Sequence, residues 1–472
     1  MDDLTALLSA GGAPNSLATP VQAVLGPAAA ATLTADPWRL LDVAGVRPAQ
    51  ADAFARSVLA AARRDDQRRA AALACWHLRR AAADGHSALP LPVLAAALAA
   101  DGAGTPPGVV EAACASGRVV ARRAAADAPP MLALLRLAKD EEAVAAALLR
   151  LGAQARATVV ACPRGEAAAA AAAPETAAAA GLAVGTGAPS AGRVVRIRAG
   201  DPAGSASART GAATVAAAGL GADDRVVVED AELLDISAAA ALVEALPAEA
   251  GLVLAGDPVL IAAGPGRVLH DVLASGALPV RPVASASRGP LHSLRTAVRE
   301  GRLTVVDDPT REVVVVPSDD AGAATRTVQL VSDSIPRVVG VPSGEVLVVT
   351  PRRGGRSGVE SLDTALRAAL GPRERPYART VHQAMSESAS AVVVVLPAES
   401  AGSLTRALVA TALSLAGRHV SVVHAAGPAL AEAVARIPDR PRHTRLATLL
   451  RAAPGSAPGA GDAQPAGLSS TR

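Results

Sequence analysis

The second half of the chain constrains the fold most, because short apolar runs alternate there with helical stretches. Beyond Gly221 these runs are continuously apolar and rich in valine and leucine. Such runs are typical of parallel strands whose two faces are both covered by helices. The expected strands are residues 225–228, 251–255, 312–316, 346–350, 391–396 and 419–424, with helices at 236–246 and 267–275. The sequence therefore predicts an α/β fold built on parallel sheets.

The first 150 residues show a different periodicity. Apolar positions recur every three or four residues in segments 54–58, 73–78, 93–98 and 131–149, a spacing that is typical of amphipathic helices. Turns at Gly45, Gly85 and Gly102 separate these segments. We expect residues 1–150 to form an all-α domain.

The middle of the chain and its tail lack strong patterning. One short strand-like run, 157–161, precedes alanine runs and then a stretch of Gly, Ala, Ser and Pro that reaches residue 215. Alanine favours helix but buries little surface, so we expect part of this segment to be loosely packed or disordered. The tail, residues 451–472, is rich in Pro, Gly, Ala and Ser, and we expect it to be disordered.

Length and charge set broad limits. The 472 residues suffice for two to four domains, and 46 basic against 43 acidic residues leave a net charge of only +3. Any contact with DNA must therefore come from local patches. The single lysine, Lys139, lies in a helical context (135–142) with no glycine before it, so we expect a surface residue rather than a phosphate ligand.

Cysteine usage and the N-terminus indicate the compartment. Cys75, Cys114 and Cys162 are far apart and form no CxxC pair, so we expect neither a metal site nor a disulfide. The acidic N-terminus lacks the pattern of a signal peptide, and no strongly apolar span of about 20 residues occurs. We expect a soluble, cytoplasmic protein with no membrane partner.

Residues 36–52 are the first candidate for nucleic-acid binding. Two expected helices flank a tight apolar-Gly-apolar turn, Val43 to Val46. In such a helix-hairpin-helix the backbone amides around Gly45 can face a DNA phosphate, and Arg47 would add a positive charge. The alternative is an ordinary αα-hairpin closed by glycine.

A pair of acids is the first candidate for catalysis. The apolar run 226–228 ends in two adjacent carboxylates, Glu229 and Asp230. This is the Walker B arrangement, in which one carboxylate holds Mg²⁺ and the next orients the attacking water. The alternative is two solvated acids at the end of a strand.

Together with segments further along, these motifs resemble those of the RecD-like superfamily 1 DNA helicases. Residues 65–90 resemble the segment that follows the hairpin in that family. Gly256-Asp257-Pro258 resembles motif III, although residues 259–262 lack the family's glutamine that senses the γ-phosphate. The family order of the acids is Asp then Glu, and the inversion at Glu229 and Asp230 implies impaired hydrolysis.

The resemblance continues through the last 130 residues. Residues 346–366 resemble the strand, Thr-Pro and basic loop of the second motor domain, which implies DNA contacts from Thr350, Arg352 and Arg353. Residues 380–396 resemble motif V and keep Thr380 and His382, which we also assign to DNA binding.

Residues 408–423 resemble motif VI. The arginine that stabilises charge on the γ-phosphate in that family is Leu415 here, and only Arg418 remains downstream. Loss of such an arginine can cost several orders of magnitude in rate.

The phosphate-binding loop of the family has no intact counterpart. Gly187 and Gly192 keep the spacing of its glycines, while Arg193 stands in the place of the lysine and Val194 lacks the hydroxyl that binds Mg²⁺. The alternative is a Gly/Pro/Ser loop without a ligand. The expected nucleotide-binding remnant is thus Gly187, Gly192, Arg193, Gly256, Asp257 and Arg418, and we assign no metal site.

The expected architecture follows from this resemblance. Residues 1–150 would be an all-α helix-hairpin-helix domain, 151–280 a truncated first RecA-like domain and 281–450 a second RecA-like domain.

Three functions fit the sequence. The first is an ATPase-impaired helicase homologue that acts as a DNA-binding or partner-binding module in DNA repair or recombination. The second is a divergent but active ATP-dependent 5′-to-3′ DNA helicase, in which case ATP and Mg²⁺ are required. The third is a structural remnant that binds neither nucleotide nor DNA.

Overall fold

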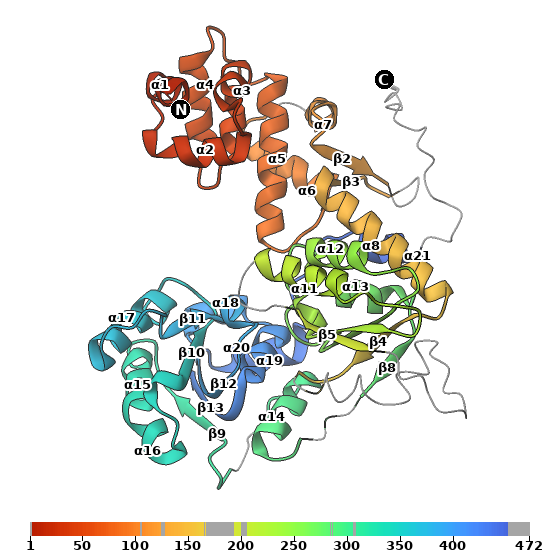
Figure 1. Ribbon diagram of the computed structural model, residues 1–472. Helices are drawn as coiled ribbons and strands as arrows, with labels where there is room; N and C mark the ends of the chain where they lie inside the picture. The colour runs from red at the N-terminus through yellow and green to blue at the C-terminus, as the bar shows by residue number, and fades with distance from the viewer. Residues whose placement is uncertain are drawn as a thin grey trace.

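The computed structural model describes residues 2–103, 106–123, 128–164, 166, 193–199, 205–283, 285, 287–304 and 308–451. An N-terminal helical region is followed by two five-stranded parallel sheets with helices on their faces (Figure 1). This confirms the predicted α/β class with a helical N-terminus and two RecA-like sheets. The predicted disordered tail, from residue 452 onward, lies outside the described residues.

The N-terminal region packs around large buried side chains. Trp38 and Phe54 are fully buried, and the Trp38 indole donates to Asp52 Oδ1 at 2.9 Å. The Arg69 guanidinium binds both Asp52 carboxylate oxygens at 2.8 Å, which ties the hairpin to the following helix. The helices are α1 (Asp2–Ala10), α2 (Ala18–Leu25), α3 (Ala29–Ala35), the 3₁₀ helix η2 (Pro37–Asp42), α4 (Pro48–Val58) and α5 (Gln67–Ala83).

A small antiparallel sheet corrects the all-α prediction for residues 1–150. It has the order β1-β3-β2 and consists of β1 (Leu89–Pro90), β2 (Val119–Arg122) and β3 (Met131–Leu134), with α6 (Leu91–Ala100) and α7 (Pro106–Ala115) beside it. The apolar stretch 131–149, predicted as one helix, is divided between β3 and the start of α8. Two- to four-residue strands are too short for a period-two pattern to separate them from a helix.

The first parallel sheet has the strand order β5-β6-β7-β4-β8. Its strands are β4 (Ala157–Ala161), β5 (Val194–Arg198), β6 (Arg225–Glu229), β7 (Gly251–Gly256) and β8 (Val280–Pro282), and every pair is parallel. Strands β4, β6 and β7 were predicted. Strands β5 and β8 were not, because β5 contains two arginines and β8 has only three residues.

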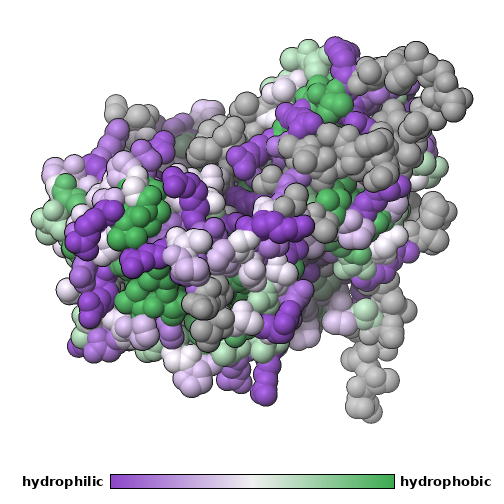
Figure 2. Space-filling view, turned by 90° about the horizontal axis from the view of Figure 1, so that it is seen from below, coloured by the Kyte–Doolittle hydropathy of each residue, from purple (hydrophilic) through white to green (hydrophobic). Residues whose placement is uncertain are grey.

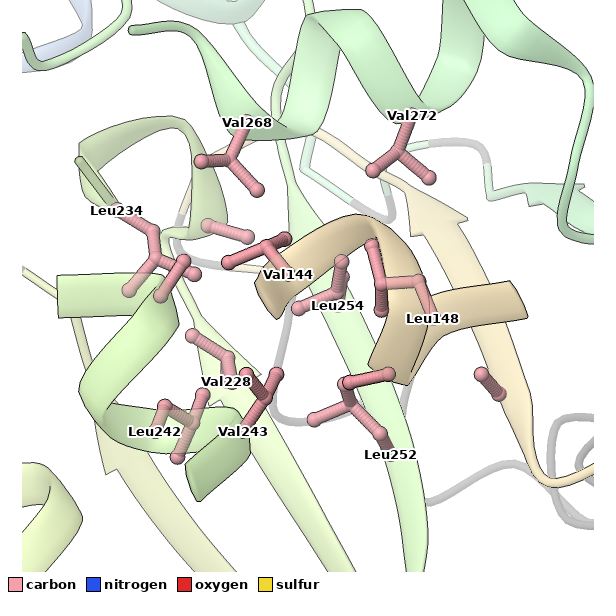
Figure 3. Close-up of a cluster of buried hydrophobic side chains, with 14 of the residues drawn as sticks. Val144, Leu148, Val228, Leu234, Leu242, Val243, Leu252, Leu254, Val268 and Val272 are labelled. Atoms are coloured by element: carbon pink, nitrogen blue, oxygen red, sulfur yellow. The ribbon is translucent and has the colours of Figure 1, made fainter. Parts of the chain in front are cut away.

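Helices cover this sheet and complete its core. They are α8 (Leu135–Ala153), α11 (Ser205–Ala217), α12 (Ile236–Ala245), α13 (Val268–Ser275) and the C-terminal α21 (Leu446–Arg451). In Figure 3, Val144 and Leu148 of α8 lie with Leu254 of β7 and with Val268 and Val272 of α13. Helix α8 therefore belongs to the core of the first sheet, which favours a domain boundary before Leu135 rather than at residue 150.

The second parallel sheet has the order β11-β10-β12-β13-β9. Its strands are β9 (Val313–Pro317), β10 (Val346–Thr350), β11 (Ala378–Thr380), β12 (Ala389–Leu396) and β13 (Ala416–His424). The central strand β12 is buried from Ala391 to Leu396, as expected for a run covered on both faces. The helices are α14 (Pro290–Arg299), α15 (Ala323–Gln329), a π-helical turn η4 (Leu330–Ser334), α16 (Ile335–Val339), α17 (Val359–Leu370), α18 (Val381–Ala384), α19 (Arg406–Ser414) and α20 (Pro428–Arg436).

The two sheets are joined through the loop after β7. Leu260 and Ile261 of this loop are buried in the core beside the second sheet, and the Ile261 N–H donates to the Thr411 hydroxyl at 2.9 Å. Among the described helices, none is long and apolar enough to cross a bilayer.

Candidate functional site

Three acids meet at the carboxyl edge of the first sheet. Asp230 follows β6 directly, Glu232 lies in the turn after it, and Asp257 follows β7. Ligands of open parallel sheets bind at this edge, close to the point where the strand order reverses. Here that point lies beside β4, because the chain passes from β4 to the far strand β5 and later returns to β8.

The two predicted catalytic acids differ in their surroundings. Asp230 is buried, has a left-handed φ of 52°, and receives a hydrogen bond from Arg198 Nε at 2.7 Å. The Glu229 carboxylate is partly exposed and lies 3.5 Å from Arg196 on the neighbouring strand. Both arginines come from β5, so the strand that the sequence pattern did not reveal supplies the cations that pair with these two acids.

Glu232 is buried like Asp230 and Asp257. Its Oε2 accepts the Asp257 N–H at 3.0 Å, whereas its Oε1 has no hydrogen-bond partner among the described residues. Burial, and secondarily the charge of Asp230, raise the pKa of Glu232 to about 8. A carboxyl group with this pKa is largely protonated near neutral pH.

Asp257 connects the first sheet to the second. Its carboxylate accepts a hydrogen bond from Arg299 at the end of α14, and also the Val259 N–H at 3.0 Å. Burial raises the pKa of Asp257, and the Arg299 charge opposes that rise. Both Asp230 and Asp257 are therefore already paired with guanidinium groups of this chain.

Gly256 has a structural role at this edge. A Cβ on Gly256 would lie 2.5 Å from Glu232 Oε2 and 2.8 Å from the Ala231 backbone nitrogen. The glycine thus permits the close approach of the turn that carries Glu232. Its predicted assignment to a nucleotide-binding remnant is not needed to explain its presence.

The chain leaves β4 at the same edge with Cys162, Pro163 and Arg164. The Cys162 thiol is buried, and its pKa is raised to about 12 by burial and by the neighbouring acids, with Glu232 and Asp257 the largest contributors. The two terminal nitrogens of Arg164 are buried without a hydrogen-bond partner among the described residues. Sequence reasoning missed Arg164, Arg198, Glu232 and Arg299, because none of them forms a motif by itself.

Arg193, predicted to stand in the place of the phosphate-binding lysine, lies far from the three acids. It precedes β5 at the amino edge of the sheet, while Asp230 lies at the carboxyl edge. Its backbone N–H and guanidinium both bind the Asp224 carboxylate, and Nη1 donates to the Ala218 carbonyl at 3.1 Å. Arg193 therefore does not meet the acids, and Val194 is the first residue of β5. Gly187 and Gly192 lie outside the described residues.

The candidate DNA-binding residues of the second sheet differ in their exposure to solvent. Thr350 is fully buried and its hydroxyl donates to the Ser357 carbonyl at 3.1 Å. This burial argues against the predicted contact between Thr350 and DNA. Arg352 and Arg353 lie on the exposed loop after β10, where Arg352 donates to the Glu399 carbonyl at 2.7 Å.

The residues of motifs V and VI are also spread apart. Thr380 caps α18 by accepting the Gln383 N–H at 3.1 Å, and His382 is exposed. Leu415 is fully buried. Arg418 is exposed near the amino end of β13, where it lines a pocket with Arg311 rather than with the three acids.

The hairpin has the predicted geometry at its turn. Val43 and Val46 are buried, and Gly45 is exposed with a φ of 86°. The Trp76 indole donates to the Val46 carbonyl at 3.0 Å, which anchors the turn to α5. Arg47 is exposed at the start of α4, where its N–H donates to the Gln50 side chain at 2.9 Å. The first helix of the hairpin is the 3₁₀ helix η2 rather than an α-helix.

Possible metal ligands are few. No cluster of three or more His, Cys, Asp or Glu side chains with the geometry for a metal ion occurs in the part of the chain that the structure describes. All three cysteines are free.

Comparison with known proteins supplies a family for the N-terminus. No curated protein matches the chain. Among solved structures, the arterivirus nonstructural protein 10 (helicase) has 12% identity and a TM-score of 0.33 and covers 68% of this chain and 73% of its own. The same protein in complex with DNA has 13% identity, a TM-score of 0.33 and coverages of 67% and 73%.

The PRRSV helicase has 14% identity, a TM-score of 0.31 and coverages of 65% and 61%. Likenesses this distant assign no role to any residue. A family model described as the "ATP-dependent RecD2 DNA helicase HHH domain" matches residues 1–88, the segment that contains the hairpin. The chain therefore carries at its N-terminus the helix-hairpin-helix domain of the RecD2 DNA helicases.

Proposed function

We propose that this protein is a RecD-like helicase homologue that binds DNA and does not hydrolyse ATP. The observation that carries the proposal is the pairing of Asp230 with Arg198 and of Asp257 with Arg299. A magnesium ion at this edge would need carboxylate oxygens that are free of such partners. The residues present are thus a poor fit for Mg–ATP.

Two further features support the loss of hydrolysis. The only lysine of the chain, Lys139, is exposed on α8, so no lysine can take the place that a phosphate-binding loop requires. Leu415, in the position of the motif VI arginine, is fully buried and cannot stabilise negative charge on the γ-phosphate.

DNA binding is supported by the hairpin. Gly45 and Arg47 are both exposed at the turn, and a turn amide together with a guanidinium is a combination that contacts a phosphate. Arg352 and Arg353 offer a second basic loop, and a protein partner is compatible with the same module. The expected setting is DNA repair or recombination in the cytoplasm.

The alternative is an active ATP-dependent 5′-to-3′ helicase. It is favoured by the convergence of Asp230, Glu232 and Asp257 at the carboxyl edge of a parallel sheet, where nucleotides bind in such folds. In that case the arginine pairs would have to open when Mg–ATP enters.

The deciding experiment measures ATP hydrolysis by the full-length protein with and without single-stranded DNA, together with a nucleotide titration. We expect no DNA-stimulated hydrolysis, while a gel-shift assay detects DNA binding. ATPase activity that disappears in the double variant Glu229→Ala/Asp230→Ala, but not in the control Glu244→Gln on the exposed face of α12, would establish the alternative. Absence of both DNA and nucleotide binding would indicate a structural remnant.

A further inference from the structure

A pocket of about 460 Å³ lies at the amino edge of the second sheet. It is formed where α14 begins, where the chain enters β9 and β13, and where α16 ends. None of the three acids at the carboxyl edge of the first sheet lines it. Its lining residues with ionisable side chains are Arg288, His292, Arg295, Arg311, Glu312 and Arg418.

The pocket has an excess of three positive charges, since four arginines face one glutamate. Figure 2 views the molecule from below, the side toward which α14 and α16 lie in Figure 1, and shows many hydrophilic side chains with smaller hydrophobic areas between them. A concave site with concentrated positive charge attracts anions more strongly than a flat surface does.

Arg295 provides a fixed charge. Its Nη2 donates to the Leu413 carbonyl near the end of α19 at 2.9 Å and also to the Ala416 carbonyl at the start of β13, so two buried backbone carbonyls hold the guanidinium in place. Burial lowers the pKa of Arg295 to about 10, which still leaves it charged at neutral pH.

Two acids near these arginines, Glu312 and Asp308, accept hydrogen bonds from backbone N–H groups. Glu312 accepts the Leu291 N–H at the start of α14, at 3.1 Å. Asp308 accepts the N–H groups of Thr310 and Val313, at 2.8 and 2.7 Å. Among the described residues, neither carboxylate forms an ion pair with Arg311 or Arg418, while the charge of Glu312 acts on Arg295.

Arg288, Arg311 and Arg418 are exposed, and in the described part of the chain none of them forms an ion pair. The backbone at Arg311 is held in place, with a left-handed φ of 58° and with its carbonyl accepting a hydrogen bond from His419 Nδ1 at 2.7 Å. A non-glycine residue in this conformation is costly and persists only where the surroundings fix it. The loop that carries Arg311 is therefore preorganised.

We propose that this pocket binds a phosphate-bearing ligand. Planar guanidinium groups form paired hydrogen bonds with phosphate oxygens. Three exposed guanidinium groups that form no ion pair among the described residues, around the fixed Arg295, match a group that carries two or more negative charges. The volume lies in the range of pockets that hold small molecules. The phosphate belongs either to a free diphosphate-containing molecule or to the phosphorylated 5′ end of a DNA strand. This site extends the proposed function, which depends on the N-terminal hairpin and not on these residues.

The test titrates the full-length protein with inorganic pyrophosphate, and separately with single-stranded oligonucleotides of one sequence that carry a 5′-phosphate or a 5′-hydroxyl. The variant is Arg311→Gln/Arg418→Gln, whose side chains are exposed and whose folding can be verified by its melting temperature. The control is Arg337→Gln/Arg436→Gln, which removes the same charge from exposed positions on α16 and α20.

We expect pyrophosphate affinity to fall roughly tenfold or more in the pocket variant and to remain unchanged in the control. If the source is a DNA end, the 5′-phosphorylated strand binds more tightly than the 5′-hydroxyl strand, and the pocket variant alone loses this preference. Absence of both pyrophosphate binding and a 5′-phosphate preference would overturn the proposal, as would equal losses in variant and control. Hairpin-dependent DNA binding is measured with the 5′-hydroxyl strand, so failure of this proposal is distinguishable from failure of the proposed function.

Discussion

Glu232 is a buried carboxyl group at the edge of the first sheet, and its pKa is strongly raised. It lies in a turn that the sequence does not mark as special, yet it is buried beside Asp230 and bonded to the backbone of Asp257. Its raised pKa means that the folded protein binds a proton that the unfolded chain releases. The stabilising contribution of this proton is fully present below about pH 4.5 and is lost as the pH rises to about 8.

Replacement of Glu232 by glutamine is therefore expected to stabilise the protein at alkaline pH. The side-chain oxygen can still accept the Asp257 N–H, while the ionisation cost disappears. We expect the free energy of unfolding at pH 8 to rise by roughly 2–4 kcal/mol over the parent, with little change at pH 4.5. Urea unfolding at several pH values measures this, and Glu244→Gln at an exposed position serves as control. If the free energy of unfolding depends on pH in the same way in Glu232→Gln and in the parent, the raised pKa of Glu232 is contradicted.

A second prediction at this scale concerns Gly256. Replacement by alanine would force its Cβ against Glu232 and against the backbone of Ala231, which cannot move away as a flexible side chain could. We expect a loss of about 2–4 kcal/mol in the free energy of unfolding. Gly344→Ala is the matched control, because nothing lies within 4 Å of a Cβ there. Equal melting temperatures for the two variants would rule out tight packing of the Glu232 turn against Gly256.

At the scale of elements, the sequence predicted long buried strands well and short or charged ones poorly. The valines of β12 and β13 formed apolar runs that only a covered strand explains, and both parallel sheets could be inferred from such runs. Strand β5 alternates valine or isoleucine with arginine and was assigned in part to a loop. Because the site cations Arg196 and Arg198 lie on β5, missing that strand also hid the pairing of Asp230.

The hairpin is the element whose DNA contact is most directly testable. Arg47→Gln removes an exposed charge while the backbone hydrogen bond from its N–H to Gln50 can remain. We expect several-fold weaker binding to DNA of any sequence, and a dependence of log affinity on log salt that is shallower by about one unit. Fluorescence anisotropy at several salt concentrations measures both.

Arg436→Gln, an exposed arginine on α20, is the control for net charge in the hairpin experiment. If the two variants lose affinity equally, the hairpin has no specific role in binding DNA.

At the scale of the whole molecule, one junction brings together parts that are distant in sequence. The N–H groups of Ser87 and Ala88, which follow α5, donate to the His443 carbonyl at 3.1 and 3.3 Å. The Gly266 N–H of the loop after β7 donates to the Gly85 carbonyl at 3.0 Å. The segment before α21 thus connects the helix-hairpin-helix domain to the first sheet, and residues 85–88 contact both. Periodicity cannot reveal such a junction, because its hydrogen bonds join backbone groups hundreds of residues apart.

Arg445 stabilises this junction through two neighbouring acids, the buried Glu141 and the exposed Glu142. Its N–H donates to Glu141 Oε1 at 2.8 Å, its guanidinium binds Glu142 at 2.7 Å, and the Ser87 hydroxyl donates to Glu141 at 2.7 Å. Burial raises the pKa of Glu141, and Arg445 opposes that rise. Removal of the guanidinium would leave a fully buried carboxylate without its nearest counter-charge.

Arg445→Met should therefore loosen the connection between the domains. We expect a loss of about 2–4 kcal/mol in stability and faster amide exchange at residues 85–88, since Glu141 either stays charged without a partner or takes up a proton. Arg451→Met, which removes an exposed arginine of α21 bonded to the Ala274 carbonyl, should leave exchange at residues 85–88 unchanged. Hydrogen–deuterium exchange with peptide resolution distinguishes the two. Equal protection of residues 85–88 in both variants would mean that the hairpin domain is held to the first sheet by other contacts, and that Arg445 matters only locally.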